Sequence, residues 1–205
     1  TPAGETGRTF TTGSGSGGIL FRPAAANDAV TIAVSLARSA RYPAIEELFY
    51  FGPHPGNFAF EIGNPDIGPE HALGLDVSFR WRSARASGEI TYFRNDISNY
   101  LFRRPLTEEE FDERLPEFAR RFPGRGIAEE EHDHAGDQVE AAAAAEEEEG
   151  HGHEFPFVEY VSADSLLQGV EAHGDFQLTS HVSAEIGLDY VRGSLKATDE
   201  PLPRI

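Results

Sequence analysis

The sequence predicts an all-β fold, namely part of a transmembrane antiparallel β-barrel with about six strands and two long extracellular loops. Three observations lead to this prediction. Apolar and polar residues alternate over several stretches, short and long connections alternate between those stretches, and no apolar run approaches the ~18 residues of a membrane-spanning helix. A barrel can cross a membrane without such a run, because its strands alternate in polarity.

Alternation with a period of two is the pattern of a strand that has one apolar face. The predicted strands lie near residues 18–23, 28–38, 72–82, 87–102, 156–178 and 181–196. Their apolar positions include Val30, Ile32, Val34, Leu36, Leu73, Leu75, Val77, Phe79, Trp81, Val170, Ala172, Phe176, Leu178, Val182, Ala184, Ile186, Leu188 and Tyr190. The opposite positions carry Asp76, Arg80, Glu171, Asp175, Glu185 and Asp189. Such a polar face fits either the outside of a soluble β-sandwich or the aqueous lumen of a barrel.

Connection lengths favour the barrel over the sandwich. The links around 24–27, 83–86 and 179–180 are short, whereas those at 39–71 and 103–155 are long. Outer-membrane barrels have short turns on one side and long extracellular loops on the other. The stretch 51–70 holds four prolines and four glycines, so we expect little regular structure in the first loop.

Arg94 conflicts with the simple alternation, because it shares parity with Ile90 and Tyr92 on the apolar side of their strand. Either a β-bulge shifts the phase near Tyr92, or Arg94 already lies at the rim of the membrane.

The second long loop carries most of the negative charge. The chain has a formal net charge of −18, and 17 of its 35 acidic residues lie between 105 and 154. This charge argues against nucleic acid as a partner. Within the loop, Thr107 and Glu110 fit a capping box, and a helix after them would place Phe111, Leu115, Phe118 and Phe122 on one face, with Pro116 inside it.

The same loop holds two His-x-His pairs, His132 with His134 and His151 with His153. Imidazole is a favoured zinc ligand, and nearby carboxylates can complete the coordination sphere. The alternative is a solvated low-complexity loop with no ordered site. Cysteine is absent, so thiolate ligands and disulfides are excluded.

Two further histidines, His54 and His71, lie at opposite ends of the first long loop. Each could contact a solute at a barrel mouth, or it could serve only in loop packing.

We expect no enzymatic activity and no required cofactor. The run Gly13–Gly18 formally contains Gly-x-Gly-x-x-Gly, but a dinucleotide site needs a preceding strand and a following helix, and a strand and turn follow here. No Ser-His-Asp or paired-carboxylate arrangement has a supporting context.

The segment 35–70, SLARSARYPAIEELFYFGPHPGNFAFEIGNPDIGPE, resembles a signature of TonB-dependent outer-membrane receptors. The matching positions are Arg41, Pro43, Glu46, Glu47, Leu48, Gly52, Pro53, His54, Phe60, Glu61, Ile62, Gly63, Asn64, Pro65, Pro69 and Glu70. The strand rhythm extends the resemblance over nearly the whole chain. The Gly-Pro-His loop and the histidine-rich loop are similar to the zinc-uptake subgroup, although a siderophore is also possible as the solute.

The resemblance implies a receptor in the outer membrane of a Gram-negative cell, with the long loops 39–71 and 103–155 outside. It implies that residues 1–205 are an interior segment of the barrel, and that the plug domain and the TonB-contacting box belong to the rest of a longer chain. The expected partners are membrane lipid, the plug, the TonB complex and a metal ion or metal chelate. A soluble or surface-exposed all-β metal-binding module is the alternative function, and an adhesin-like surface protein anchored by the barrel is a third.

Overall fold

The described part of the chain forms one eight-stranded β-sheet and two helices. A computed structural model describes residues 7–23, 29–124 and 155–203. The long strands are β1 (Gly15–Phe21), β2 (Val30–Arg41), β5 (Glu70–Arg82), β6 (Ala86–Leu106), β7 (Phe157–Gln177) and β8 (Ser183–Leu195). The short elements are α1 (Ile45–Phe49), β3 (Phe51–His54), β4 (Ala59–Ile62) and α2 (Glu108–Arg121). These bounds confirm the six predicted strands to within a few residues.

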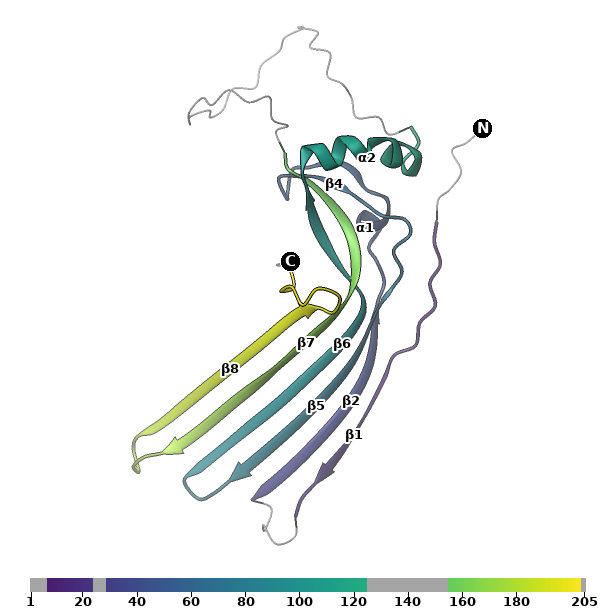
Figure 1. Cartoon of the computed structure of the whole chain (residues 1–205). Helices are drawn as coiled ribbons and strands as arrows, with labels where there is room; N and C mark the ends of the chain where they lie inside the picture. Colours follow the sequence, from purple (N-terminus) through teal and green to yellow (C-terminus); the bar gives the residue numbers. More distant parts are fainter. Residues whose placement is uncertain (1–6, 24–28, 125–154, 204–205) are drawn as a thin grey trace, which may run out of the picture. The chain divides into compact units, whose positions relative to one another are not determined.

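The strand order is β1-β2-β5-β6-β7-β4-β3, and β8 pairs with β7 (Figure 1). The sheet is open in this chain, as expected for part of a barrel. The pairs β1–β2, β2–β5, β5–β6 and β7–β8 are antiparallel, and β6 lies beside β7. Strand β4 pairs parallel with the first residues of β7. Among the described helices, none is long and apolar enough to cross a membrane.

The chain divides into two compact units. Unit 1 comprises Thr1–Ala44, Asp66–Arg103 and Val161–Ile205, and unit 2 comprises Ile45–Pro65 and Arg104–Tyr160. Strands β6 and β7 contribute residues to both units. Unit 1 therefore contains most of the long strands, and unit 2 contains both helices and the β3–β4 hairpin.

The short turns described in unit 1 lie at the same end of the strands, as predicted. Between β5 and β6, the Ser83 amide donates to the Ala86 carbonyl at 2.7 Å. Between β7 and β8, the Leu178 amide donates to the Val182 carbonyl at 2.9 Å. The predicted turn at 24–27 lies outside the described residues.

The first long connection is more regular than the sequence suggested. The expectation of little regular structure in 51–70 is wrong, because the β3–β4 hairpin occupies part of it. Pro53 is compatible with a strand here because β3 is an edge strand and needs no ladder hydrogen bond on its outer side. The hairpin turns at Phe58, whose backbone has a φ of 49°.

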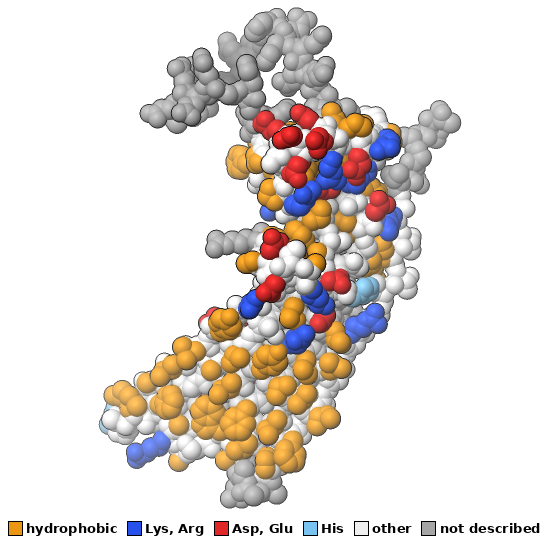
Figure 2. All heavy atoms as spheres, in the orientation of Figure 1, with side chains coloured by type: hydrophobic (Ala, Val, Ile, Leu, Met, Phe, Trp, Pro, Cys, Tyr) orange, Lys and Arg blue, Asp and Glu red, His pale blue; other side chains and the backbone are white. Residues whose placement is uncertain are grey.

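One face of the unit 1 sheet carries a band of exposed apolar side chains, which we call the apolar face (Figure 2). Leu188 is 71% exposed and Ile186 is 55% exposed, whereas leucine and isoleucine in the core of a water-soluble protein are buried. Other large apolar residues exposed on this face are Ile19, Val34, Leu36, Leu73, Phe79, Ile90, Tyr92, Val170 and Tyr190. The opposite, polar face carries residues such as Asp76, Arg80 and Glu89.

Arg94 lies on the apolar face without any bulge. The register of β5 and β6 is continuous from His71↔Ser98 to Arg82↔Ser87, so the bulge alternative is wrong. Arg94 Nη2 lies 3.5 Å from Asp96 Oδ2, and Asp96 also pairs with Lys196. These charges mark the end of the apolar band, as the rim alternative requires.

Candidate functional site

In unit 2, helix α2 packs on the strands and precedes the histidine-rich segment in the sequence. The predicted capping box is present: the Glu110 amide donates to Thr107 Oγ1 at 3.1 Å, and the Thr107 amide donates to Glu110 Oε2 at 3.0 Å. The Thr107 backbone hydrogen bond is the main reason that the pKa of Glu110 is lowered. Acidic residues in the first turn and Arg120 and Arg121 in the last turn also complement the helix dipole.

The predicted apolar face of α2 packs on the strands. The cluster of buried hydrophobic residues consists of Ile62, Leu106, Phe111, Phe118, Phe122 and Phe157, with Phe51, Phe60 and Leu115 packed against it. The Phe111 and Phe157 rings stack with centroids 3.8 Å apart. Pro116 is accommodated inside the helix.

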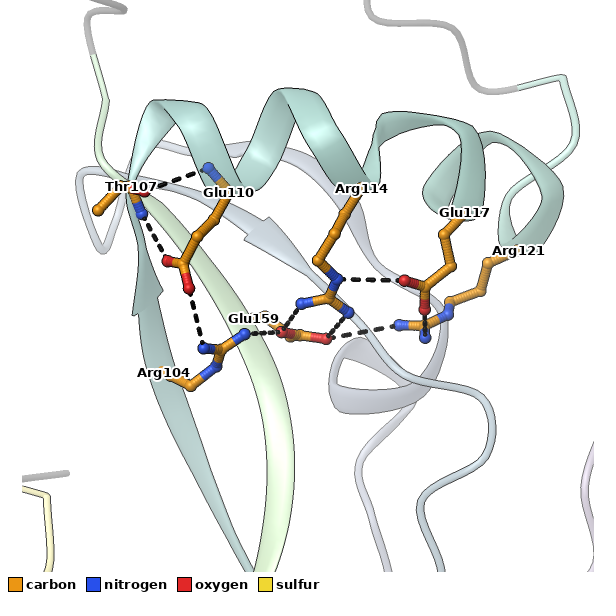
Figure 3. Close-up of polar contacts among 7 residues, drawn as sticks. All are labelled: Arg104, Thr107, Glu110, Arg114, Glu117, Arg121 and Glu159. Atoms are coloured by element: carbon orange, nitrogen blue, oxygen red, sulfur yellow. Dashed lines mark hydrogen bonds and ion pairs between the residues drawn. The ribbon is translucent and has the colours of Figure 1, made fainter.

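A buried carboxylate, Glu159 on β7, ties α2 to the sheet (Figure 3). Its side chain is 3% exposed. Arg114 binds it in bidentate fashion, Nη1 donating to Oε2 at 2.6 Å and Nη2 to Oε1 at 2.7 Å. Arg104 Nη2 donates to Oε2 at 3.1 Å, and Arg121 Nη1 lies 3.8 Å from Oε1. Three guanidinium groups therefore compensate one desolvated charge.

The electrostatic result is a carboxylate that stays ionised although it is buried. Burial alone would raise the pKa of Glu159, but the hydrogen bonds from Arg114 and then Arg104 outweigh it, so that the pKa is lowered. The same contact raises the pKa of Arg114. Glu117, which accepts from Arg114 Nε at 3.1 Å and Arg121 Nη2 at 2.6 Å, also has a lowered pKa because of the Arg114 hydrogen bond. These carboxylate and guanidinium groups form ion pairs with one another, so we assign them a structural role.

The other face of the β3–β4 hairpin carries a second buried carboxylate, Glu61, which is 2% exposed. It accepts hydrogen bonds from Asn57 Nδ2 at 2.6 Å and from the Tyr160 hydroxyl at 3.3 Å. His54 lies on the same face, because the register pairs His54 with Ala59 and Gly52 with Glu61. Its ring meets Tyr50 edge-on with centroids 5.6 Å apart, and its buried Nδ1 has no hydrogen-bond partner in the described residues.

The polar face of unit 1 is hollowed near the short-turn edge. A cleft of about 530 Å³ is lined by Leu20, Arg22, Ala29, Thr31, Arg80, Trp81, Arg82, Ser87, Gly88, Glu89, His173 and Asp175. Arg80 Nε pairs with Glu89 Oε1 at 2.9 Å, and His173 Nε2 lies 3.3 Å from Asp175 Oδ2. This cleft can accept a polar, charged surface.

The structure separates the histidines singled out in the sequence. His132, His134, His151 and His153 lie outside the described residues, so zinc capture by them stays a prediction. His54 belongs to unit 2 and His71 to unit 1. His71 has the same parity on β5 as Leu73 and Leu75, but it pairs with Ser98, beyond the Arg94 and Asp96 charges that end the apolar band. Its Nδ1 is buried and has no hydrogen-bond partner in the described residues. Across residues 7–23, 29–124 and 155–203, no group of three or more His, Asp or Glu side chains could hold a metal ion.

Sequence reasoning missed the roles of Glu61 and Glu159. Each acidic residue stands between apolar neighbours in a strand, as in Phe60-Glu61-Ile62 and Val158-Glu159-Tyr160. That pattern is a usable signal, because a carboxylate in such a position needs partners if its face is covered.

Comparison with known proteins identifies the family to which this architecture belongs. Residues 2–205 match the family described as TonB dependent receptor-like, beta-barrel. One similar solved structure is the copper transporter OprC, with 16% identity and a TM-score of 0.54 over 85% of this chain and 20% of that chain. Another is the siderophore receptor PirA from Pseudomonas aeruginosa, with 15% identity and a TM-score of 0.56 over 89% of this chain and 28% of that chain. The FrpB iron transporter from Neisseria meningitidis (F3-3 variant) is also similar, with 13% identity and a TM-score of 0.50 over 93% of this chain and 21% of that chain.

At these identities the solved structures establish likeness of fold, and this chain spans between 20% and 28% of their length. The family match, in contrast, covers almost the whole sequence. The protein belongs to the family of TonB-dependent receptor-like β-barrels.

Proposed function

We propose that this chain is part of the barrel wall of an outer-membrane receptor that takes up a scarce metal ion or metal chelate, with zinc as the favoured solute. The observation that carries the proposal is the unit 1 sheet, which exposes a continuous apolar band on one face and polar side chains on the other. Lipid outside and water inside match that division. Proteins of similar fold include a copper transporter, a siderophore receptor and an iron transporter, which supports a metal or its chelate as cargo.

The single sheet favours this function over a soluble metal-binding module. In a β-sandwich, the apolar residues of one sheet are buried against a second sheet. All eight described strands belong to one sheet, and the large side chains named above for the apolar face remain exposed.

The polar face then lines the barrel interior, where the rest of the receptor supplies a plug domain. The cleft beside Arg80 and Glu89 offers paired charges to such a partner. Energy for transport would come from the TonB complex acting on the parent protein.

Metal capture is assigned to the His-x-His pairs of the acidic loop, His132 with His134 and His151 with His153. Carboxylates alone prefer hard ions such as calcium, and imidazole shifts the preference toward zinc. Among the described residues, His54 is our candidate for a solute contact, because its buried Nδ1 is unsatisfied and it shares a hairpin face with Glu61. His71 stays a second candidate, because its Nδ1 is likewise buried and has no hydrogen-bond partner among the described residues.

Uptake by the full-length receptor tests the proposal. Cells that depend on this receptor are given radiolabelled zinc, copper or ferric siderophore, with and without a protonophore. We expect energy-dependent zinc uptake, reduced severalfold by combined replacement of His132, His134, His151 and His153 by Ala. Replacing Glu146, Glu147, Glu148 and Glu149 by Gln removes four charges from the same loop and should reduce uptake less. Energy-dependent uptake of none of these solutes would contradict the proposal.

A peptide spanning residues 128–154 tests the loop itself. Zinc affinity should fall as the pH drops through ~6.5, because protons compete for neutral imidazole. If the peptide with all four histidines replaced by Ala binds zinc equally well, the histidines are not the ligands.

A further inference from the structure

A groove of about 480 Å³ runs along the apolar face of unit 1 between β1 and β2. Its lining residues are Gly15, Ser16, Gly17, Gly18, Ile19, Val34, Leu36, Arg38 and Leu73. Gly15 pairs with Arg38 and Gly17 with Leu36, so both glycines lie on the apolar face, where their missing side chains leave space. A Cβ built at either glycine would meet no heavy atom within 4 Å.

The groove is apolar along its length and cationic at one end. Ile19, Val34 and Leu36 line it, and each of them is at least 40% exposed. From Val34 to Arg38 the strand rises ~13 Å, the length of a substantial part of one acyl chain. A single Arg at the end of an apolar groove is complementary to an amphipathic ligand with an anionic head group.

Arg38 lies at the level where the apolar band gives way to charge. The register aligns Arg38 with Leu73 and Leu73 with Asp96, the partner of Arg94 and Lys196. Arg94 and Lys196 are thus already paired, whereas the exposed Arg38 guanidinium has no hydrogen bond or ion pair in the part of the chain that the structure describes. Arg38 is therefore able to bind an external anion.

We propose that this groove binds one acyl chain of a membrane lipid whose head group carries a phosphate, and that Arg38 contacts that phosphate. The planar guanidinium matches phosphate oxygens in bidentate geometry. The groove is continuous with the apolar band, so a lipid chain lying in it extends the surrounding acyl layer. This inference rests on the proposed function, because that function assigns the apolar face to lipid.

The test uses the delipidated full-length receptor in a mild detergent and measures lipid binding by native mass spectrometry. The probes are phosphatidic acid and the diacylglycerol with the same chains, which differ only in the phosphate, and inorganic phosphate as a competitor. Arg38→Gln removes the charge-assisted contact of an exposed guanidinium with the phosphate, so it should weaken phosphatidic acid binding about tenfold and leave diacylglycerol binding unchanged. Gly17→Leu fills the groove with an apolar side chain and should weaken both lipids.

Two variants serve as matched controls. Arg85→Gln removes an exposed arginine from the short-turn edge, outside the groove. Gly187→Leu adds the same side chain at another glycine whose Cβ would meet nothing within 4 Å, but on the polar face, since Gly187 pairs with His173. Both should bind the two lipids like the unmodified receptor.

The outcomes separate this inference from the proposed function. If all variants bind both lipids equally, the apolar face meets lipid but the groove is not a specific site, and the inference is overturned. Displacement of phosphatidic acid by millimolar inorganic phosphate, without any diacylglycerol binding, would show a simple anion site and also overturn it. If no variant binds either lipid and the receptor stays soluble without detergent, the membrane placement itself is wrong.

Discussion

Unit 2 buries eight of the ten hydrophobic side chains that are buried in the described part of the chain, whereas unit 1 buries two, Ile67 and Leu101. Unit 2 places its aromatic residues between α2 and the strands, as a water-soluble domain does. Unit 1 leaves residues such as Leu188 and Ile186 exposed on a single layer of strands.

The difference teaches where each unit obtains its stability. A sheet with one uncovered apolar face gains little from the hydrophobic effect until an apolar medium covers that face. Unit 2 carries its own core and neutralises its buried charge with its own arginines. Unit 1 should therefore depend on its surroundings, and unit 2 on its internal contacts.

The largest effect is expected from removing the apolar medium altogether. The 205-residue chain expressed alone has an uncovered apolar face and unpaired outer edges on β1 and β8, so it should aggregate without detergent or lipid. Size-exclusion chromatography with and without detergent measures this. A monodisperse soluble product that melts cooperatively would mean that unit 1, like unit 2, is stable without an apolar medium.

Glu159→Gln tests the internal contacts of unit 2. It leaves Arg114, whose side chain is 27% exposed and still pairs with Glu117, beside a neutral amide, so the loss should be about 3 kcal/mol, the low end of the range for a broken buried ion pair. We expect α2 of the full receptor to lose that much protection against hydrogen exchange. Glu113→Gln, at an exposed position of the same helix, is the control and should change it by less than ~0.5 kcal/mol.

Val77→Arg tests the dependence of unit 1 on its surroundings. Val77 pairs with Val34 and Tyr92 in the middle of the apolar face. An arginine near the midplane of a bilayer costs about 2–4 kcal/mol in a barrel strand. Unfolding of the full receptor from lipid vesicles by urea should show this loss, with Ser35→Arg on the polar face, opposite Asp76, as the control. Equal losses for both variants would mean that the two faces do not differ in environment.

Acid should weaken unit 2 in a defined direction. The pKa of Glu159 is lowered in the folded state from its ordinary value of 4.5, so its contribution is fully present above pH 4.5 and is lost as the pH falls through the lower folded value. The exchange protection of α2, corrected for intrinsic rates, should stay level from pH 7 to 5 and decline below that. In the Glu159→Gln variant the decline should be shallower; an identical decline would assign it to other carboxylates, such as Glu117.

The strands and the helix were predictable because local patterns specify them. Alternation located four of the six long strands, the less regular stretches at 18–23 and 87–102 completed the set, and the capping box with its following aromatic residues located α2. The β3–β4 hairpin was missed because Pro53 argues against a strand in general and is acceptable only on an edge, which is a property of the assembled sheet.

The partners of the buried carboxylates could not be read from the chain. Arg114 and Glu159 are 45 residues apart, and only the docking of α2 on β7 brings them together. The parity of Arg94 was predicted correctly, but the choice between a bulge and the rim needed the observed register. Local sequence specifies which residues share a face, and tertiary pairing decides what that face meets.

The smallest expected effect concerns the helix cap that was predicted from sequence. Thr107→Ala removes the side-chain oxygen that accepts from the Glu110 amide, leaving a helix donor unsatisfied at about 1 kcal/mol. Thr107→Ser keeps that oxygen and should retain most of the protection of α2 against hydrogen exchange. If both variants lose the same amount, the methyl group of Thr107 rather than its hydroxyl stabilises the turn. Because the cap is local to unit 2, neither variant should change the urea unfolding that reports on Val77, and a change there would mean that the two units do not unfold independently.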